Sequence, residues 1–161
     1  MSTTFQEYWD YSQHHIPAMI RILRANAMHL ISVEIADEHQ DTKESTDLVV
    51  RVTGGEVAVR TRRKQYGKQY RDFTIRSKSR YGQKTELDKL REGFARWYLY
   101  AWEADYGYDY ILVDMDAVRS AGLLDVNRPE CCNRDGTRFI AIDLAELRQH
   151  GCIVVEANLR M

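Results

Sequence analysis

Hydrophobic and polar residues first follow a helical period along this 161-residue chain. A helix is predicted over residues 17–36, with Pro17 in its first turn. Its apolar stripe consists of Ile20, Leu23, Ala27 and Leu30. The segment HLISVEI at residues 29–35 also alternates between apolar and polar, so the end of this stretch fits a strand equally well. The pattern leaves both alternatives open there.

Three strands are predicted next, at residues 47–52, 57–62 and 72–76. The segment TELDKLREGFARWYLYAW then predicts a helix, because Thr85 and Asp88 almost form a capping box and an apolar stripe follows them. The remaining pattern alternates strands and short helices in the order YILVDM, DAVRSAGLL, NRDGTRFIAIDL, LAELRQHG and CIVVEAN. Together these elements predict one α/β domain over residues 1–161, close to α+β, with a mixed β-sheet and helices on its faces.

The stretch DLVVRVTGGEVAVRTRR, residues 47–63, contains the candidate chemistry. If Gly54 and Gly55 form a two-residue hairpin loop, the valines of both strands share an apolar face that packs on the core. The opposite face then carries Asp47 across from Arg62, with Arg60 one diagonal step away. A third strand at 72–76 would add Arg76 and Asp72 to the same face.

A strong charge asymmetry surrounds this stretch. Residues 60–84 carry a charge of +9, although the whole chain carries −1. The cations include Arg63, Lys64, Arg71, Lys78 and Arg80, and aromatic residues are interleaved with them. Arginines beside aromatic rings are typical of surfaces that hold phosphates and stack bases. A solvated loop balanced by acids elsewhere in the fold explains the same charges equally well.

The pattern of an acid opening a strand, a glycine turn and an apolar strand with charged residues two apart resembles the PD-(D/E)XK nuclease fold, as in archaeal Holliday-junction resolvases. The first acid falls at Asp47 and the (D/E)-x-K element falls on Arg60-Thr61-Arg62. The sequence is also similar to a group of phage-type proteins with strings such as TDLVV, VRTR, DFTIRS and TELDK. The resemblance implies a restriction-endonuclease-like core, a homodimer, and binding of nucleic acid, DNA rather than RNA.

By this resemblance the catalytic residues would be Asp47, Arg62 and Glu34, with Mg²⁺ held by Asp47 and Glu34. Arg60 stands where these nucleases place a metal-binding carboxylate, and a guanidinium repels Mg²⁺. Asp72 and Glu86 are alternative acids, and surface ion pairs explain each acid more simply. The function classes left open are a metal-dependent nuclease, a nucleic-acid-binding protein with an altered or lost metal site, and an inactive phage-type protein that binds a protein or a small anion.

Other signals are weaker. Asp114 and Asp116 follow a predicted strand, where α/β sites are common, but an Asp capping the next helix is the simpler account. His14 and His15 have no helical partner for a metal and are interpreted as surface residues. The acidic, aromatic start MSTTFQEYWD does not resemble a targeting peptide, and no apolar run is long enough to span a membrane. The chain is therefore expected to be cytoplasmic.

Overall fold

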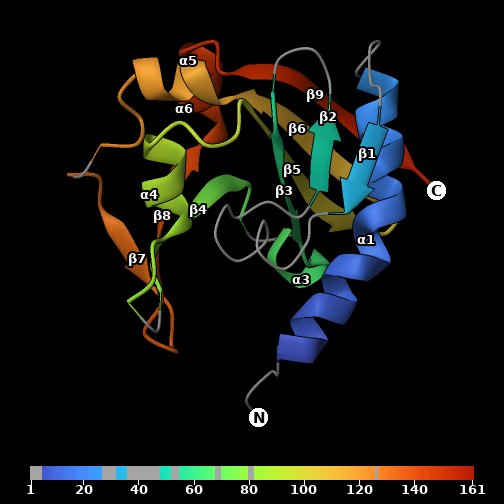
Figure 1. Ribbon diagram of the computed structural model, residues 1–161, viewed down its shortest axis with the longest axis horizontal. Helices are drawn as coiled ribbons and strands as arrows, with labels where there is room; N and C mark the ends of the chain where they lie inside the picture. The colour runs from blue at the N-terminus through green and yellow to red at the C-terminus, as the bar shows by residue number, and fades with distance from the viewer. Residues whose placement is uncertain are drawn as a thin grey trace.

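The computed structural model describes residues 5–26, 32–35, 48–51, 55–67, 70–79, 82–125 and 127–161. Two sheets and a two-stranded ribbon form its framework (Figure 1). The helices are α1 (Phe5–Asn26), α3 (Lys64–Gly67), α4 (Glu86–Arg91), α5 (Met115–Ser120) and α6 (Leu144–Gln149). The strands are β1 (Ser32–Ile35), β2 (Leu48–Arg51), β3 (Val57–Arg62), β4 (Asp72–Lys78), β5 (Trp97–Ala104), β6 (Gly107–Asp114), β7 (Glu130–Cys132), β8 (Arg138–Asp143) and β9 (Ile153–Arg160). The predicted mixed α/β class is confirmed.

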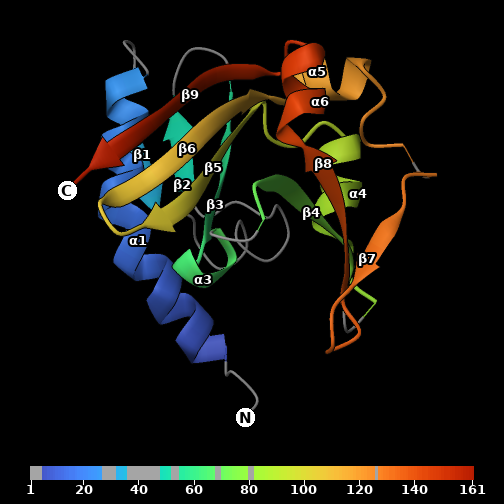
Figure 2. The same cartoon turned by 180° about the vertical axis from the view of Figure 1, so that it is seen from behind.

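The first sheet has four strands in the order β3-β5-β6-β9, and its pairing is mixed. β3 runs parallel to β5, whereas β6 runs antiparallel to both of its neighbours, β5 and β9. The second sheet is antiparallel, in the order β4-β8-β7. Figure 2 shows the two sheets diverging from the end where α5 and α6 lie.

Each face of the four-stranded sheet buries its own core. On one face, Val57, Val59 and Leu99 pack with the apolar side of α1. On the other face, Tyr98 and Tyr100 pack against Phe73 and other residues of the second sheet, with α4, α5 and α6 around them. The order of layers is therefore α1, first sheet and second sheet.

The prediction that β2 and β3 pair with each other as a glycine-linked hairpin is wrong. β2 pairs antiparallel with β1, so that Val50 lies opposite Val33, and β3 pairs parallel with β5, so that Val59 lies opposite Leu99. β2 and β3 lie next to each other without a ladder among their described residues. The predicted third strand, β4, pairs with β8 in the other sheet rather than with β3.

The two long helix predictions are also corrected. The first helix begins at Phe5, so Pro17 lies inside it rather than in its first turn. Of the two alternatives left open for the end of this stretch, the strand is confirmed at residues 32–35. The second helix is only α4, and β5 follows it. The Thr85–Asp88 capping box is present, but Gly93 at φ +97° turns the chain soon after Arg91. The short helices and the last strands lie where the pattern placed them, and β7 and α3 were not predicted.

Candidate functional site

Arg60 projects from β3 into the space between the two sheets. Its Nη2 lies 2.7 Å from Oε2 of Glu86, and its Nη1 donates to the carbonyl oxygen of Thr74 at 3.2 Å. Glu86 is only 6% exposed, and it also accepts the hydroxyl of Tyr98. Burial, and secondarily the charge of Glu86, raise the pKa of Tyr98 well above its ordinary value. The phenol therefore stays protonated as a donor to Glu86.

Arg62 projects from the same face of β3 and makes a second set of contacts. Its Nη1 lies 3.2 Å from Oδ1 of Asp72 and donates to Oγ1 of Thr74 at 3.2 Å. The same atom is 3.3 Å from the hydroxyl of Tyr100, which lies 2.7 Å from Thr74 Oγ1. The prediction that Arg60 and Arg62 share a face, with Asp72 close to Arg62, matches this geometry. That face is packed against the second sheet rather than open to solvent.

These contacts satisfy the free edge of β4. The carbonyl of Thr74 accepts Arg60, the N–H of Thr74 lies 3.4 Å from the hydroxyl of Tyr100, and the N–H of Arg76 donates to Glu86 at 2.9 Å. Buried backbone groups at a sheet edge need such partners, because an unpaired one costs about as much as a lost hydrogen bond. The carboxylates and hydroxyls therefore offset the mutual repulsion of the clustered guanidinium groups. The network also joins the two sheets.

The side chains of the predicted metal site lie outside the described part of the structure. Asp47 lies outside the described residues, and only the backbone of Glu34 is described, in β1 opposite Val49. Among the residues that the structure describes, no three His, Cys, Asp or Glu side chains are grouped as metal ligands. Glu86 and Asp72, the alternative acids, are each paired with an arginine. A Mg²⁺ site at Asp47 and Glu34 stays a prediction.

The other basic residues predicted to bind phosphate are spread over several surfaces. Arg63 lies over the ring of Tyr11 of α1 at 4.6 Å, and Lys64 forms an ion pair with Asp105. Arg76 and Lys78 are exposed on β4. Arg80 lies outside the described residues. The described cations of this segment therefore do not form one continuous patch, although several of them reach the surface.

Arg71 lies in a cluster that the sequence pattern did not indicate, here called the Tyr106 edge and composed of Arg71, Tyr106, Asp109 and Arg160. Asp109 accepts hydrogen bonds from Arg71 and from the hydroxyl of Tyr106. The guanidinium of Arg160 lies 6.0 Å from the centroid of the Tyr106 ring. Tyr106 is 44% exposed, and Arg71 is 51% exposed.

The electrostatics of the Tyr106 edge keep its carboxylate charged. Burial raises the pKa of Asp109, but the hydrogen bonds from Tyr106 and Arg71 outweigh burial, so the pKa lies below its ordinary value. Tyr106 and Arg160 belong to the β5–β6 turn and to the end of β9, far from the basic segment in sequence. Only the pairing of β6 with β9 brings them together, because Gly107 lies opposite Arg160.

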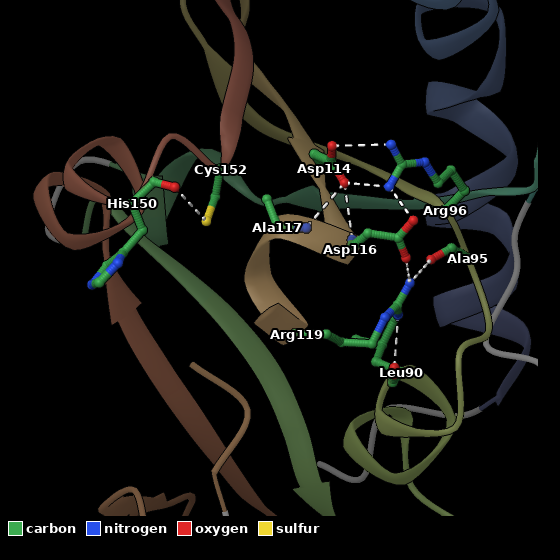
Figure 3. A network of polar contacts seen from close by, with 9 residues as sticks. All are labelled: Leu90, Ala95, Arg96, Asp114, Asp116, Ala117, Arg119, His150 and Cys152. Atoms are coloured by element: carbon green, nitrogen blue, oxygen red, sulfur yellow. Dashed lines mark hydrogen bonds and ion pairs between the residues drawn. The ribbon is translucent and has the colours of Figure 1, made fainter. Parts of the chain in front are cut away.

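A second polar network surrounds the start of α5 (Figure 3). Asp114 caps this helix by accepting the N–H groups of Asp116 and Ala117, and it holds Arg96 through contacts of 2.6 and 3.1 Å. Asp116 also contacts Arg96 and accepts Arg119 at 2.6 Å, and these contacts, that of Arg119 first, lower the pKa of Asp116. The capping account of Asp114 is thus confirmed, and both carboxylates are engaged within the protein.

His15 is not a surface residue, which corrects its interpretation from sequence. It is 2% exposed, between α1 and the first sheet, and its Nδ1 is hydrogen-bonded to the hydroxyl of Tyr108. Its Nε2 is buried and has no hydrogen-bond partner in the described part of the chain. Burial lowers the pKa of His15, against the opposing charge of Glu103. His14, next to it, is exposed as predicted.

Comparison of the chain with protein-family models, with curated proteins and with solved structures finds no match. The nuclease-like core and the phage-type kinship therefore stay predictions. None of the helices in the described part of the chain is long and apolar enough to cross a membrane.

Proposed function

We propose that this protein binds single-stranded nucleic acid at the Tyr106 edge. The observation that carries the proposal is an exposed tyrosine ring flanked by two arginines that are distant in sequence: Arg71 near its hydroxyl and Arg160 over its ring. Proteins that bind single strands combine aromatic rings, on which bases stack, with cations that contact phosphates. Tyr70, which precedes Arg71, is 55% exposed and adds a second ring nearby in sequence.

Binding without cleavage is the form of the proposal that the contacts support. Arg60 and Arg62 form the (D/E)-x-K position of the nuclease pattern, and they hold Glu86 and Asp72 between the sheets. A Mg²⁺ ion needs carboxylate oxygens that are free to coordinate it, usually together with water and phosphate. Among the described acids, those nearest this position are already occupied by guanidinium groups.

The test is fluorescence anisotropy with labelled single-stranded DNA, single-stranded RNA and duplex DNA over a series of salt concentrations. We expect the single strands to bind more tightly than the duplex, and DNA at least as tightly as RNA. The Tyr106→Ala variant should weaken binding by about 5- to 150-fold, the effect of losing one stacked base. Tyr106→Phe keeps a ring and should lose much less. Arg71→Ala should reduce the salt slope by about one unit.

The control variant is Val154→Ala, since Val154 is exposed on β9 and lies outside the Tyr106 edge. Each strand is also incubated with Mg²⁺, Mn²⁺ or EDTA, and we expect it to stay intact in all three. Metal-dependent cutting that disappears in Asp47→Ala would replace the proposal with the nuclease hypothesis. Absence of salt-sensitive binding to any of the nucleic acids would reject it.

A further inference from the structure

A groove of about 460 Å³ opens beside the Tyr106 edge, where the inter-sheet face of the first sheet extends beyond the second sheet. Figure 2 shows β6 and β9 extending away from β4, β8 and β7 toward the C-terminus. The groove is lined by these two strands, by Trp102 of β5, by Arg71 and by Leu144 and Arg148 of α6. Its volume lies within the range of small-ligand pockets.

The strand register explains which side chains line the groove. One row of paired residues runs across the four strands of the first sheet, so its members share one face. From β3 through β5 and β6 to β9, the row consists of Arg62, Trp102, Asp109 and Asn158. Arg62, at the β3 end of this row, lies between the sheets, whereas Asn158, at the β9 end, is exposed. The groove is thus the open continuation of the inter-sheet space.

Charged groups of both signs lie around the groove. Arg71 contacts Asp109, and Arg148 holds Glu156 through two contacts of 2.6 and 2.9 Å. The buried surfaces of Ile111 and Leu144 add an apolar part to the lining. A bare phosphate would be repelled by the two carboxylates, and a purely apolar ligand would leave all four charges unused. A flat ligand with both donors and acceptors on its edge matches this lining.

Two observations point to a nucleobase. The guanidinium of Arg71 lies 5.4 Å from the centroid of the Trp102 ring and remains 51% exposed, and bases stack on guanidinium planes in this way. The indole of Trp102 forms part of the groove lining, and its buried Nε1 has no hydrogen-bond partner among the described residues. The amide of Asn158 offers a donor and an acceptor to the edge of a base.

From this arrangement we infer that the groove receives one unstacked nucleobase of the bound strand. The inference rests on the proposed function, because the groove shares Arg71 and Asp109 with the Tyr106 edge. A strand that stacks on Tyr106 would present its neighbouring base to Arg71 and Asn158. The Tyr106 edge would then hold the strand, and the groove would contact individual bases.

The experiment uses the full ¹⁵N-labelled chain titrated with each of the four nucleoside monophosphates, with inorganic phosphate at equal ionic strength as the reference. The signal is the indole N–H resonance of Trp102, identified in spectra of Trp102→Phe. Asn158→Trp fills the groove and removes the amide. Val154→Trp places the same side chain on an exposed part of β9 outside the groove.

We expect a saturable shift of this resonance with at least one nucleotide and none with phosphate. The shift should be retained in Val154→Trp and lost in Asn158→Trp, which should also weaken single-strand binding by about 5- to 150-fold. A resonance that does not move, that moves equally with phosphate, or that still moves in Asn158→Trp overturns the inference. Strand binding that is lost in Tyr106→Ala but unchanged in Asn158→Trp rejects the groove and keeps the proposed function. Nucleotide binding in the groove without any strand binding rejects the proposed function and keeps the groove as a nucleotide site.

Discussion

Replacing Glu86 with alanine tests whether the buried arginine network joins the two sheets. The carboxylate accepts Arg60 at 2.7 Å, the N–H of Arg76 at 2.9 Å and the hydroxyl of Tyr98. In Glu86→Ala all three donors lose this carboxylate at once, and Arg60 keeps its hydrogen bond to the carbonyl oxygen of Thr74. Glu86 is 6% exposed and Tyr98 1% exposed, so water cannot readily replace the carboxylate at the phenol.

The expected loss is about 3–5 kcal/mol of unfolding free energy, the usual effect of removing one partner from a buried ion pair. The electrostatic contribution of the Arg60–Glu86 pair lies at the lower end of this range, because the Arg60 side chain is 27% exposed and water can solvate its charge. The unsatisfied hydroxyl and N–H each add about 1–3 kcal/mol in isolation, but effects within one network do not add. For a chain of this size the loss corresponds to a decrease in Tm of about 6–20 °C.

Urea unfolding followed by circular dichroism gives the free energy directly. The matched control is Glu92→Ala, because Glu92 follows the same helix, is 43% exposed and pairs with Lys84 at the surface. Surface pairs contribute about 0–1 kcal/mol, so the control should change little. A loss below about 1 kcal/mol in Glu86→Ala would refute the reasoning. Stronger nucleic-acid binding in a variant of unchanged stability would instead show that Arg60 is a binding residue.

Three further predictions concern stability. Unfolding free energy should decrease as pH falls below 6.5, because the pKa of His15 in the folded protein lies below that value and the buried ring must become charged. Urea unfolding over a pH series measures this decrease, which should be smaller in His15→Gln. Asp114→Ala should lose about 2–3 kcal/mol by thermal unfolding, since it removes a helix cap and an ion pair, and Asp114→Asn should lose less. Gly107→Ala should lose about 2 kcal/mol or more, because its Cβ would lie 2.2 Å from the carbonyl oxygen of Leu159, whereas Gly136→Ala, which meets nothing within 4 Å, should lose about 1 kcal/mol.

Local signals predicted the C-terminal half of the fold well. Strands β6, β8 and β9 and helices α5 and α6 each lie where an apolar run meets a cap or a glycine. The caps at Thr85 and at Asp114 needed only neighbouring residues, and both are present. Features whose cause lies within one turn of chain could therefore be predicted from sequence.

Pairings between distant segments could not be predicted in this way. Gly54-Gly55 favours a tight hairpin, but the parallel partner of β3 is β5, which follows some 40 residues later in sequence. The stripe from Leu87 to Ala101 has helical spacing and predicted one helix, but the continuous apolar run of β5 is buried on both faces of the sheet, and such a run does not distinguish a strand from a helix. His15 appeared to be a surface residue for the same reason, because Tyr108, its partner, belongs to another element.

The candidate site shows the same limit. The sequence correctly placed Arg60 and Arg62 on one face, but it gave no sign that the second sheet covers this face. Tyr106, Arg160 and Asn158 carried no signal of their own, because they are brought beside Arg71 only by the ladder between β6 and β9 and by the packing of the two sheets. A basic segment indicates that an anionic partner is plausible, and the tertiary fold decides which of its cations can reach one.

The interleaved order of the strands has a consequence for synthesis of the protein on the ribosome. β4 pairs with β8 in the second sheet, and β6 pairs with β9 in the first sheet. Both sheets are therefore completed only by residues 138–160. A nascent chain lacking these residues has only part of the layer that covers the tyrosine-rich face of β5, because Ile140, Ile142, Leu144 and Leu147 of that core are missing. Native packing of both sheets must therefore wait until residues 138–160 have been synthesised, and a stop codon before β9 would leave β6 without that partner in the first sheet.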